Sequence, residues 1–133
     1  MKTSIERLVE AIGYPDGVPA GSSSAVLRVD GAEVSAEERD GRLVLSQALT
    51  DDGSLLPALA SYAAGRMLKE DAALAYGEGG AFLWQSAPAD SDSRGMLRLF
   101  ETFMDSCDWW RARMDALSGR EEAPPPETMM IRP

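Results

Sequence analysis

The chain has 133 residues, the length of one ordinary domain, which is enough to bury a hydrophobic core without disulfide or metal support. Its 13 Lys and Arg residues stand against 22 Asp and Glu residues, and the net charge of -9 argues against nucleic-acid binding, which needs a basic surface. Histidine is absent, so imidazole metal sites and Ser–His or Cys–His nucleophile pairs are excluded. Cys107 is the single cysteine and therefore forms no disulfide within the chain.

The sequence carries no targeting or membrane signal. Glu6 and Glu10 interrupt the first apolar residues, so the N-terminus does not have the pattern of a signal peptide. No apolar run approaches the roughly 18–20 residues that span a bilayer. We therefore expect a cytoplasmic protein without nucleic acid and without stable membrane association.

The first half of the chain is expected to form a helix followed by three strands. Residues 4–12 form a short amphipathic helix, because their apolar residues repeat at helical spacing, and Gly13 ends it. Three short strands are expected over residues 25–30, 32–39 and 42–49. Gly31 supplies the first turn between them. Asp40-Gly41 supplies the second, since this dipeptide favours the positive φ of a two-residue hairpin turn.

A second helix and a second hairpin are expected next. The segment 50–54 breaks the strand pattern, and Pro57 suits the first turn of a helix over 55–68, where its missing N–H is not needed. Small residues on one flank of this helix leave room for the backbone of another helix. The hairpin has strands over 73–76 and 81–86, with a Gly-Glu-Gly-Gly turn between them.

The last helix, over 94–117, has the clearest periodicity in the sequence. Its apolar residues repeat with heptad spacing at Met96, Phe100, Phe103, Cys107, Trp110, Met114 and Leu117. Trp109 and Trp110 point about 100° apart, so we expect Trp110 in the core and Trp109 either on a half-exposed flank or against another chain. We assign residues 1–118 to one domain and residues 119–133 to a flexible Pro-rich tail.

The site motif that comes nearest to a known pattern is that of a calcium-binding loop. Asp90, Asp92, Gly95 and Glu101 match positions of an EF-hand loop. Arg94 stands at a ligand position, however, and the loop follows a strand instead of a helix. The simpler interpretation is that these acidic residues stabilise the N-terminus of the last helix.

No catalytic or cofactor-binding residue is expected. Carboxylates are abundant, yet none lies in an apolar segment that would adapt it to acid–base catalysis. The glycines at 77–80 lack the Lys-Ser/Thr of a phosphate-binding loop and lie between two strands. Cys107 lies on the heptad seam without a nearby cation, which is typical of a buried apolar residue and not of a reactive thiol.

The expected order of elements, α-β-β-β-α-β-β-α, predicts a single α+β domain with a twisted antiparallel sheet packed by helices. The second half of the chain resembles the class I chaperones of bacterial type III secretion, the CesT/SycE-like family. The resemblance is carried by the Leu-rich helix over 55–68, the LAY-GEGG-AFLW hairpin over 74–84, and Trp110-Arg111 followed by Met114 and Leu117. The first half agrees in the order of its elements.

The resemblance implies a bacterial cytoplasmic homodimer without enzymatic activity. Such a chaperone binds the N-terminal segment of a secreted effector in extended form and keeps the effector soluble and export-competent. An extended segment binds by adding a strand to a sheet edge and by placing apolar side chains in pockets. The resemblance places the dimer interface on Leu55, Leu56, Leu59, Ala63 and Met67. It places the effector-binding patches on Ile5, Leu8, Val9, Ile12, Val44, Phe82 and Trp84.

Three alternatives stay open at this stage. SycN-type chaperones of the same family pair with a different chaperone and serve the secretion gatekeeper. A small calcium- or ligand-binding regulatory domain would use the loop from Asp90 to Glu101. A coiled-coil adaptor would use the last helix, and it predicts that this helix associates with itself in isolation.

Overall fold

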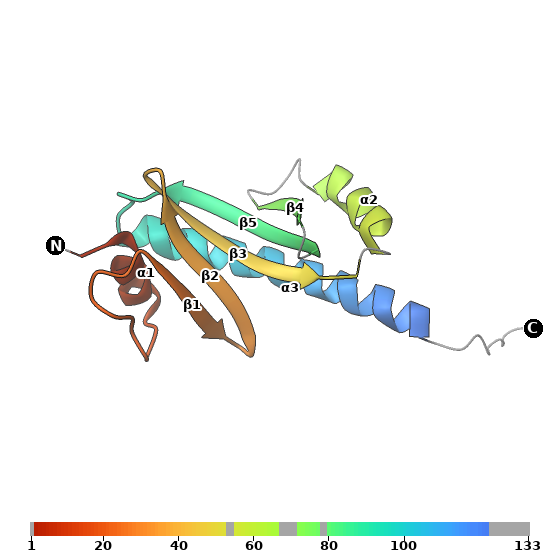
Figure 1. Ribbon diagram of the computed structural model, residues 1–133, viewed down its shortest axis with the longest axis horizontal. Coiled ribbons are helices and arrows are strands. Elements are labelled where there is room, and N and C mark those ends of the chain that lie inside the picture. Colours follow the sequence, from red (N-terminus) through yellow and green to blue (C-terminus); the bar gives the residue numbers. More distant parts are fainter. Residues whose placement is uncertain (1, 53–54, 67–71, 78–79, 123–133) are drawn as a thin grey trace, which may run out of the picture.

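The computed structural model describes residues 2–52, 55–66, 72–77 and 80–122 (Figure 1). They form a single α+β domain with a five-stranded antiparallel sheet, which confirms the predicted fold class. In chain order the elements are α1 (Ser4–Ile12), β1 (Ser24–Val29), β2 (Ala32–Arg39), β3 (Arg42–Thr50), α2 (Leu56–Arg66), β4 (Ala73–Gly77), β5 (Gly80–Pro88) and α3 (Ser93–Glu122). The order is the expected one. The bounds differ most for α3, which continues to Glu122 and not only to residue 117.

Two tight turns set the register of the first three strands. Asp30 and Gly31 have φ of 52° and 80°, and Asp40 and Gly41 have φ of 52° and 77°. A type I′ hairpin turn needs positive φ at both positions, which glycine adopts freely and aspartate tolerates. β1, β2 and β3 therefore form a meander. β5 pairs with β3, so the strand order is β1-β2-β3-β5-β4, with β1 and β4 at the edges.

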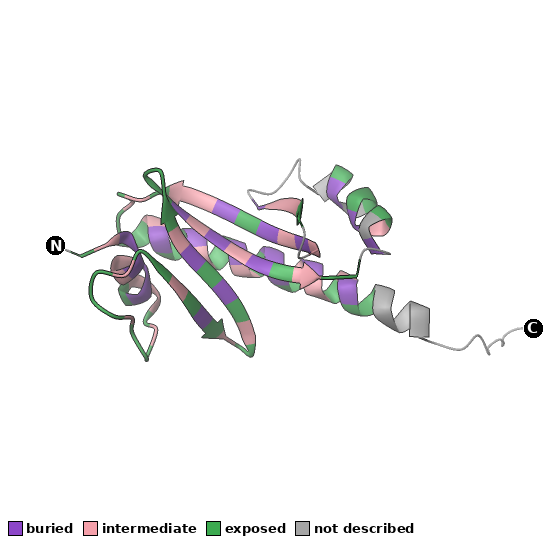
Figure 2. Cartoon of the chain, in the orientation of Figure 1, coloured by how far each residue is buried: buried purple, intermediate pink, exposed green. Residues whose placement is uncertain are grey.

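Helices α1 and α3 pack on the same face of the sheet, which we call the covered face; the opposite face is the open face. α3 runs along the sheet behind it, and α1 contacts both α3 and β2 (Figure 1). Side chains alternate along each strand, so every second one points to the helices, and the buried bands in Figure 2 follow this alternation. The resulting core contains Ile5, Leu8, Leu27, Val34, Leu43, Leu45, Leu83, Phe103 and Trp110.

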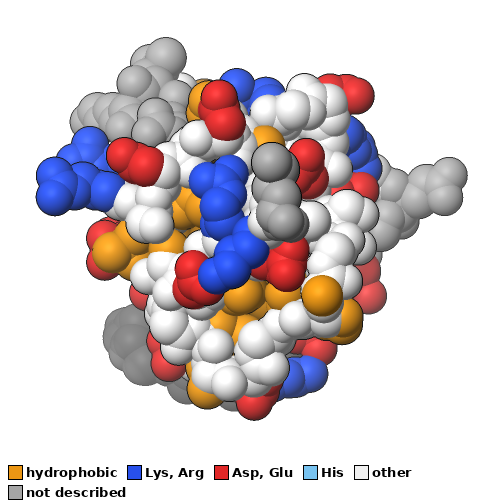
Figure 3. Space-filling model, turned by 90° about the vertical axis from the view of Figure 1, so that its left-hand side faces the viewer, with side chains coloured by type: hydrophobic (Ala, Val, Ile, Leu, Met, Phe, Trp, Pro, Cys, Tyr) orange, Lys and Arg blue, Asp and Glu red, His pale blue; other side chains and the backbone are white. Residues whose placement is uncertain are grey.

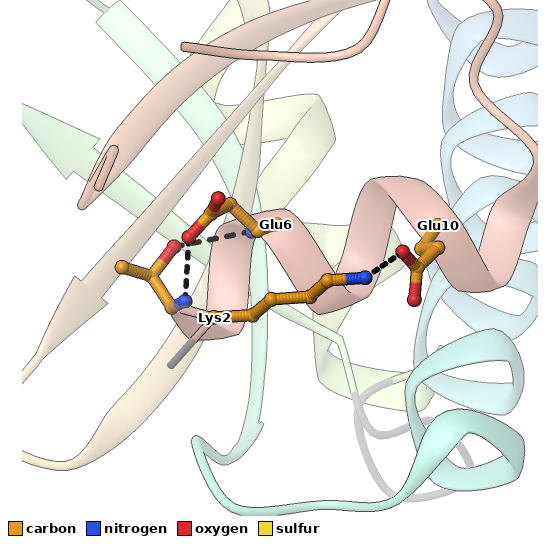
Figure 4. Close-up of polar contacts among 4 residues, drawn as sticks. Lys2, Glu6 and Glu10 are labelled. Atoms are coloured by element: carbon orange, nitrogen blue, oxygen red, sulfur yellow. Dashed lines mark hydrogen bonds and ion pairs between the residues drawn. The ribbon is translucent and has the colours of Figure 1, made fainter. Parts of the chain in front are cut away.

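Capping interactions fix both ends of α1, and Figure 4 shows those at its start. The hydroxyl oxygen of Thr3 accepts a hydrogen bond from the backbone N–H of Glu6 at 3.2 Å, and the backbone N–H of Thr3 donates to Glu6 Oε1 at 2.7 Å. The bond from the Thr3 backbone stabilises the carboxylate and holds the pKa of Glu6 below its usual value of 4.5. Lys2 pairs with Glu10 on the exposed side of the helix. Gly13, with φ of 71°, ends the helix.

The buried stripe of α3 follows most of the predicted heptad seam. Met96, Phe103, Cys107 and Trp110 are fully buried, as the spacing predicts. Phe100 is only partly buried, and the neighbouring Leu99, 4% exposed, packs in the core. A helix lying on a sheet keeps about 3.6 residues per turn, so its buried stripe drifts away from a strict heptad.

The two adjacent tryptophans divide as expected between core and flank. Trp110 is fully buried, whereas Trp109 is partly buried. Their rings meet edge to face with centroids 5.2 Å apart, and the Arg113 guanidinium lies 4.6 Å from the centroid of Trp109.

Despite the apolar stripe of α3, no helix among the described residues is both long enough and apolar enough to cross a bilayer.

Candidate functional site

The open face of the sheet exposes large apolar side chains. Val26 on β1 is 62% exposed and Trp84 on β5 is 38% exposed. The strand register places them in one row across four strands, with Ser35 and Ser46 between them. An antiparallel sheet tolerates a solvated face, but exposed aromatic and branched side chains on such a face are typical of a contact surface.

Three of the residues expected to bind an effector lie together on this open face. Val44, Phe82 and Trp84 come from the adjacent strands β3 and β5, and each is at least partly accessible. Phe82 lies opposite Ala48, which is exposed. The structure therefore joins these three side chains into one half-exposed apolar surface.

The residues expected on α1 lie in the core and not on a surface. Ile5 and Leu8 have no exposed area, and Val9 is 7% exposed, because this side of α1 packs against α3 and β2. Arg7 also ties α1 to the segment before α3, with its Nη1 donating to the Ser91 carbonyl oxygen at 2.7 Å. The apolar stripe of α1 therefore closes the protein's own core, and of the four residues expected there only Ile12 is partly accessible.

The edge strand β1 leaves backbone groups directed outward. The Ser23 carbonyl oxygen accepts a hydrogen bond from Glu38 N at 2.9 Å, so Ser23 and Glu38 form a hydrogen-bonded pair. Because hydrogen-bonded and non-hydrogen-bonded pairs alternate along the ladder, the backbone groups of Val26 and Arg28 point away from β2. The N–H of Arg28 donates to the hydroxyl of Tyr14 at 3.2 Å, which covers one end of the edge. At Val26 the described part of the chain supplies no such partner. An extended polypeptide can pair with this edge. Val26 was not among the residues expected to bind an effector.

Charged residues beside the open face pair with one another. Arg28 and Glu33 are 2.6 Å apart, and Arg39 and Glu37 are 2.9 Å apart. Both pairs are exposed, so each contributes only about 0–1 kcal/mol to stability. Figure 3, a view of the end that carries α1, likewise shows acidic and basic side chains interspersed around hydrophobic patches. The open face thus combines exposed apolar side chains with ion pairs at its border.

The residues expected at the dimer interface lie on the buried side of α2. Leu59 is fully buried, and Leu55 and Ala63 are each 6% exposed, so all three contribute to the protein's own core. The side chain of Leu56 and the whole of Met67 lie outside the described residues. The opposite side of α2 is exposed and carries the small residues Pro57, Ala60, Ser61 and Ala64 at helical spacing.

The calcium-loop motif does not assemble a ligand cluster. Asp92 Oδ1 accepts a hydrogen bond from Gly95 N at 2.8 Å, so Asp92 caps the start of α3. No group of three or more Cys, Asp and Glu side chains within the described ranges is arranged to hold a metal ion. The geometry therefore favours the helix-capping interpretation of this segment.

Comparisons with known proteins give matches in structure but not in sequence. No family model and no curated protein matches the chain. The chaperone–effector complex of HopA1 and SchA matches with a TM-score of 0.64 and 16% identity, over 81% of this chain and 90% of that chain. The ExsC–ExsE complex matches with a TM-score of 0.63 and 17% identity, over 82% and 89%.

A third match extends the same likeness. The ExoT–SpcS complex from Pseudomonas aeruginosa has a TM-score of 0.59 and 15% identity, over 79% of this chain and 91% of that chain. At these identities the likeness establishes the fold. It extends over most of both chains in all three comparisons.

Proposed function

We propose that this chain, which has the fold of a class I type III secretion chaperone, binds an N-terminal segment of a secreted effector in the bacterial cytoplasm. The bound segment is kept soluble and competent for export. The observation that carries the proposal is the open face of the sheet, with exposed apolar side chains beside an unpaired strand edge. The structural match to a complex of a chaperone with its effector supports it.

The chemistry of the open face suits an extended polypeptide. The backbone at Val26 offers hydrogen bonds to an added strand. Phe82 and Trp84, three strands away on β5, offer apolar surface to a different part of the bound segment where it crosses the open face. Aromatic residues at the centre of an interface often contribute about 2 kcal/mol or more to binding, so Trp84 is the expected anchor. Binding of this kind requires no catalytic group.

We further propose a homodimer that forms through α2. Among the side chains of α2 that the structure describes, the exposed ones are small, with Ala60 and Ala64 among them, and small side chains allow two helices to pack closely. The helix is fixed to the core by its buried side chains, Leu55, Leu59 and Ala63, so its exposed side stays available for this contact. Of residues 119–133, for which we expected a flexible tail, residues 119–122 continue α3 and residues 123–133 lie outside the described residues.

Co-purification from the native host tests the main proposal. The full chain is tagged, and the captured proteins are identified by mass spectrometry. A secreted protein that binds through its N-terminal region, and no longer binds when that region is deleted, is the expected result. Capture of a second small acidic protein with a gatekeeper would favour the heterodimeric alternative. Failure to bind any secreted protein would contradict the proposal.

Substitution of Trp84 tests the role of the open face. Trp84→Ala is expected to lower affinity for the captured protein at least about tenfold, because an apolar anchor of the interface is removed. Leu97→Ala is the matched control, since Leu97 is 36% exposed on α3 and lies outside the open face. Affinities are measured by isothermal titration calorimetry. Equal losses in both variants would show that the open face is not the binding surface.

Light scattering with size-exclusion chromatography tests the dimer. Ala60→Arg is expected to give monomers, because a long charged side chain prevents close packing of two α2 helices. Ala112→Arg places the same change at an exposed position of α3 and is expected to leave the dimer intact. A wild-type chain that is monomeric at micromolar concentration would exclude the proposed dimer.

A further inference from the structure

The sheet divides between β2 and β3. These strands pair from Arg39 and Arg42 as far as Ser35 and Ser46, where their pairing ends. Both strands nevertheless continue, β2 back to Ala32 and β3 on to Thr50. β3 remains paired with β5 over this stretch, and β2 remains paired with β1. The two halves of the sheet therefore separate and leave a gap, which we call the fork.

Backbone groups of both strands point into the fork. Residues on a strand direct their N–H and C=O groups alternately to the two sides, and Ser35 and Ser46 face each other in the last pair. Two residues further along, Glu33 and Ala48 face the fork in the same way, but the register does not pair them with each other. Each wall of the fork thus offers backbone donors and acceptors of the kind that an extended chain uses.

The fork opens into a hollow of about 810 Å³. Glu33 and Arg28 line it from the β1–β2 hairpin, Ala48 and Phe82 from β3 and β5, and Arg111 from α3. Arg28 is paired with Glu33, and the Arg111 Nη2 lies 2.7 Å from Asp108 Oδ1. Because both cations already have carboxylate partners, the hollow is not arranged to bind a phosphate or another anion.

Gln47 provides an independent indication of a ligand. Its side chain is on the covered face, 5% exposed, and it lines the hollow. Neither Nε2 nor Oε1 has a hydrogen-bond partner among the described residues. A buried carboxamide without partners is destabilising, and such groups are rare in native proteins. A partner that supplies one acceptor and one donor satisfies this carboxamide, and a peptide group supplies both.

We propose that the fork is a specific slot for an extended segment of the bound effector, whose peptide groups pair with the backbone at Glu33 and Ala48 and with the carboxamide of Gln47. The inference rests on the proposed function, because it assigns part of the effector contact. Phe82 gives one wall of the slot an apolar surface for a side chain of the segment. Gln47 is then a specificity residue that lowers stability in the free protein and contributes to affinity in the complex.

The test uses a phage library of random 12-residue peptides, selected on the wild-type full chain. A selected peptide is synthesised with a fluorescent label and titrated by anisotropy. Gln47→Leu is expected to weaken its binding at least about tenfold, while the melting temperature stays equal or rises, since a buried unpaired amide has been removed. A residue with only a structural role would not shift affinity and stability in opposite directions.

A control and a second variant complete the experiment. Gln85→Leu removes another buried glutamine of the covered face, whose Nε2 donates to Thr102 Oγ1 at 2.9 Å, and it is expected to leave affinity unchanged within twofold. Ala48→Pro removes an N–H that faces the fork and is expected to weaken binding, while the pairing of β3 with β5 is retained.

The outcomes separate the inference from the proposed function. If the selected peptides and the co-purified effector bind Gln47→Leu as tightly as wild type, the fork is not a contact site, although the proposed function stands. If binding appears only after residues 123–133 are deleted, the occupant is the chain's own terminus and the inference is overturned. If the wild-type chain binds neither peptide nor secreted protein, both proposals fail.

Discussion

The two faces of the sheet are built from the same strands but have opposite properties. On β3, Leu43 and Leu45 are fully buried beneath α3, whereas Val44 and Ser46 between them are partly accessible on the open face. The covered face holds the fold together through a continuous apolar core. The open face contributes less to stability and leaves apolar surface for a partner. One strand sequence therefore alternates between core positions and accessible positions.

The largest expected effect comes from the buried side of α1, which packs on the covered face of the sheet. Leu8→Asp buries a carboxylate in the apolar core at a position with no exposed area, which should cost more than about 4 kcal/mol. Because a domain of this size is stable by only about 5–15 kcal/mol, we expect an unfolded or insoluble protein by circular dichroism. Leu97→Asp is the control and should fold, since Leu97 is 36% exposed. A folded Leu8→Asp variant would place Leu8 on a surface.

A pair of neighbouring substitutions on β3 measures the contrast directly. Leu45→Ala leaves a cavity in the core and should cost about 2–5 kcal/mol of unfolding free energy. Val44→Ala, one residue earlier on the open face, should cost less than about 1 kcal/mol. Urea denaturation at pH 7 gives both values. Equal losses would mean that the open face is covered in solution, for example by a second copy of the chain.

The smallest expected effect concerns the polar cap at the start of α1. The folded-state pKa of Glu6 lies below its usual value of 4.5, so its contribution to stability is present above pH 4.5 and is lost as the pH falls through the lower, folded value. Wild type should therefore be more stable than Glu6→Gln at pH 7, and the difference should shrink toward pH 3. Urea midpoints at both pH values test this. A difference independent of pH would mean that the charge of Glu6 does not matter.

Local signals in the sequence were enough to predict most elements. The Asp-Gly turn at Asp40 and the amphipathic spacing of residues 4–12 depend only on neighbours along the chain, and both appear in the structure. The sequence pattern placed the end of α3 at residue 117, whereas the helix continues through Gly119 to Glu122. A single glycine lowers helix stability by only about 1 kcal/mol and need not end a helix.

The candidate site was predicted only in part. Val44, Phe82 and Trp84 were expected at the site and lie on the open face, whereas Val26, which also lies there, was not among the expected residues. Its signal was present, since Val26 is an apolar residue at a position where the strand alternation requires the solvent side. The burial of Ile5 and Leu8 was not predictable, because an apolar helical stripe has the same pattern whether it faces its own sheet or a partner.

By itself, the sequence determined the element order, the α+β class and the absence of histidine, which rules out imidazole metal sites and Ser–His or Cys–His pairs, because these follow from composition and local periodicity. Only the tertiary structure decided which apolar stripes close the core and which stay open. It also decided that β2 and β3 separate beyond Ser35 and Ser46, with Gln47 left unpaired beside the gap. The physical reason is that burial and strand pairing depend on contacts between segments far apart in the chain, which no local pattern records.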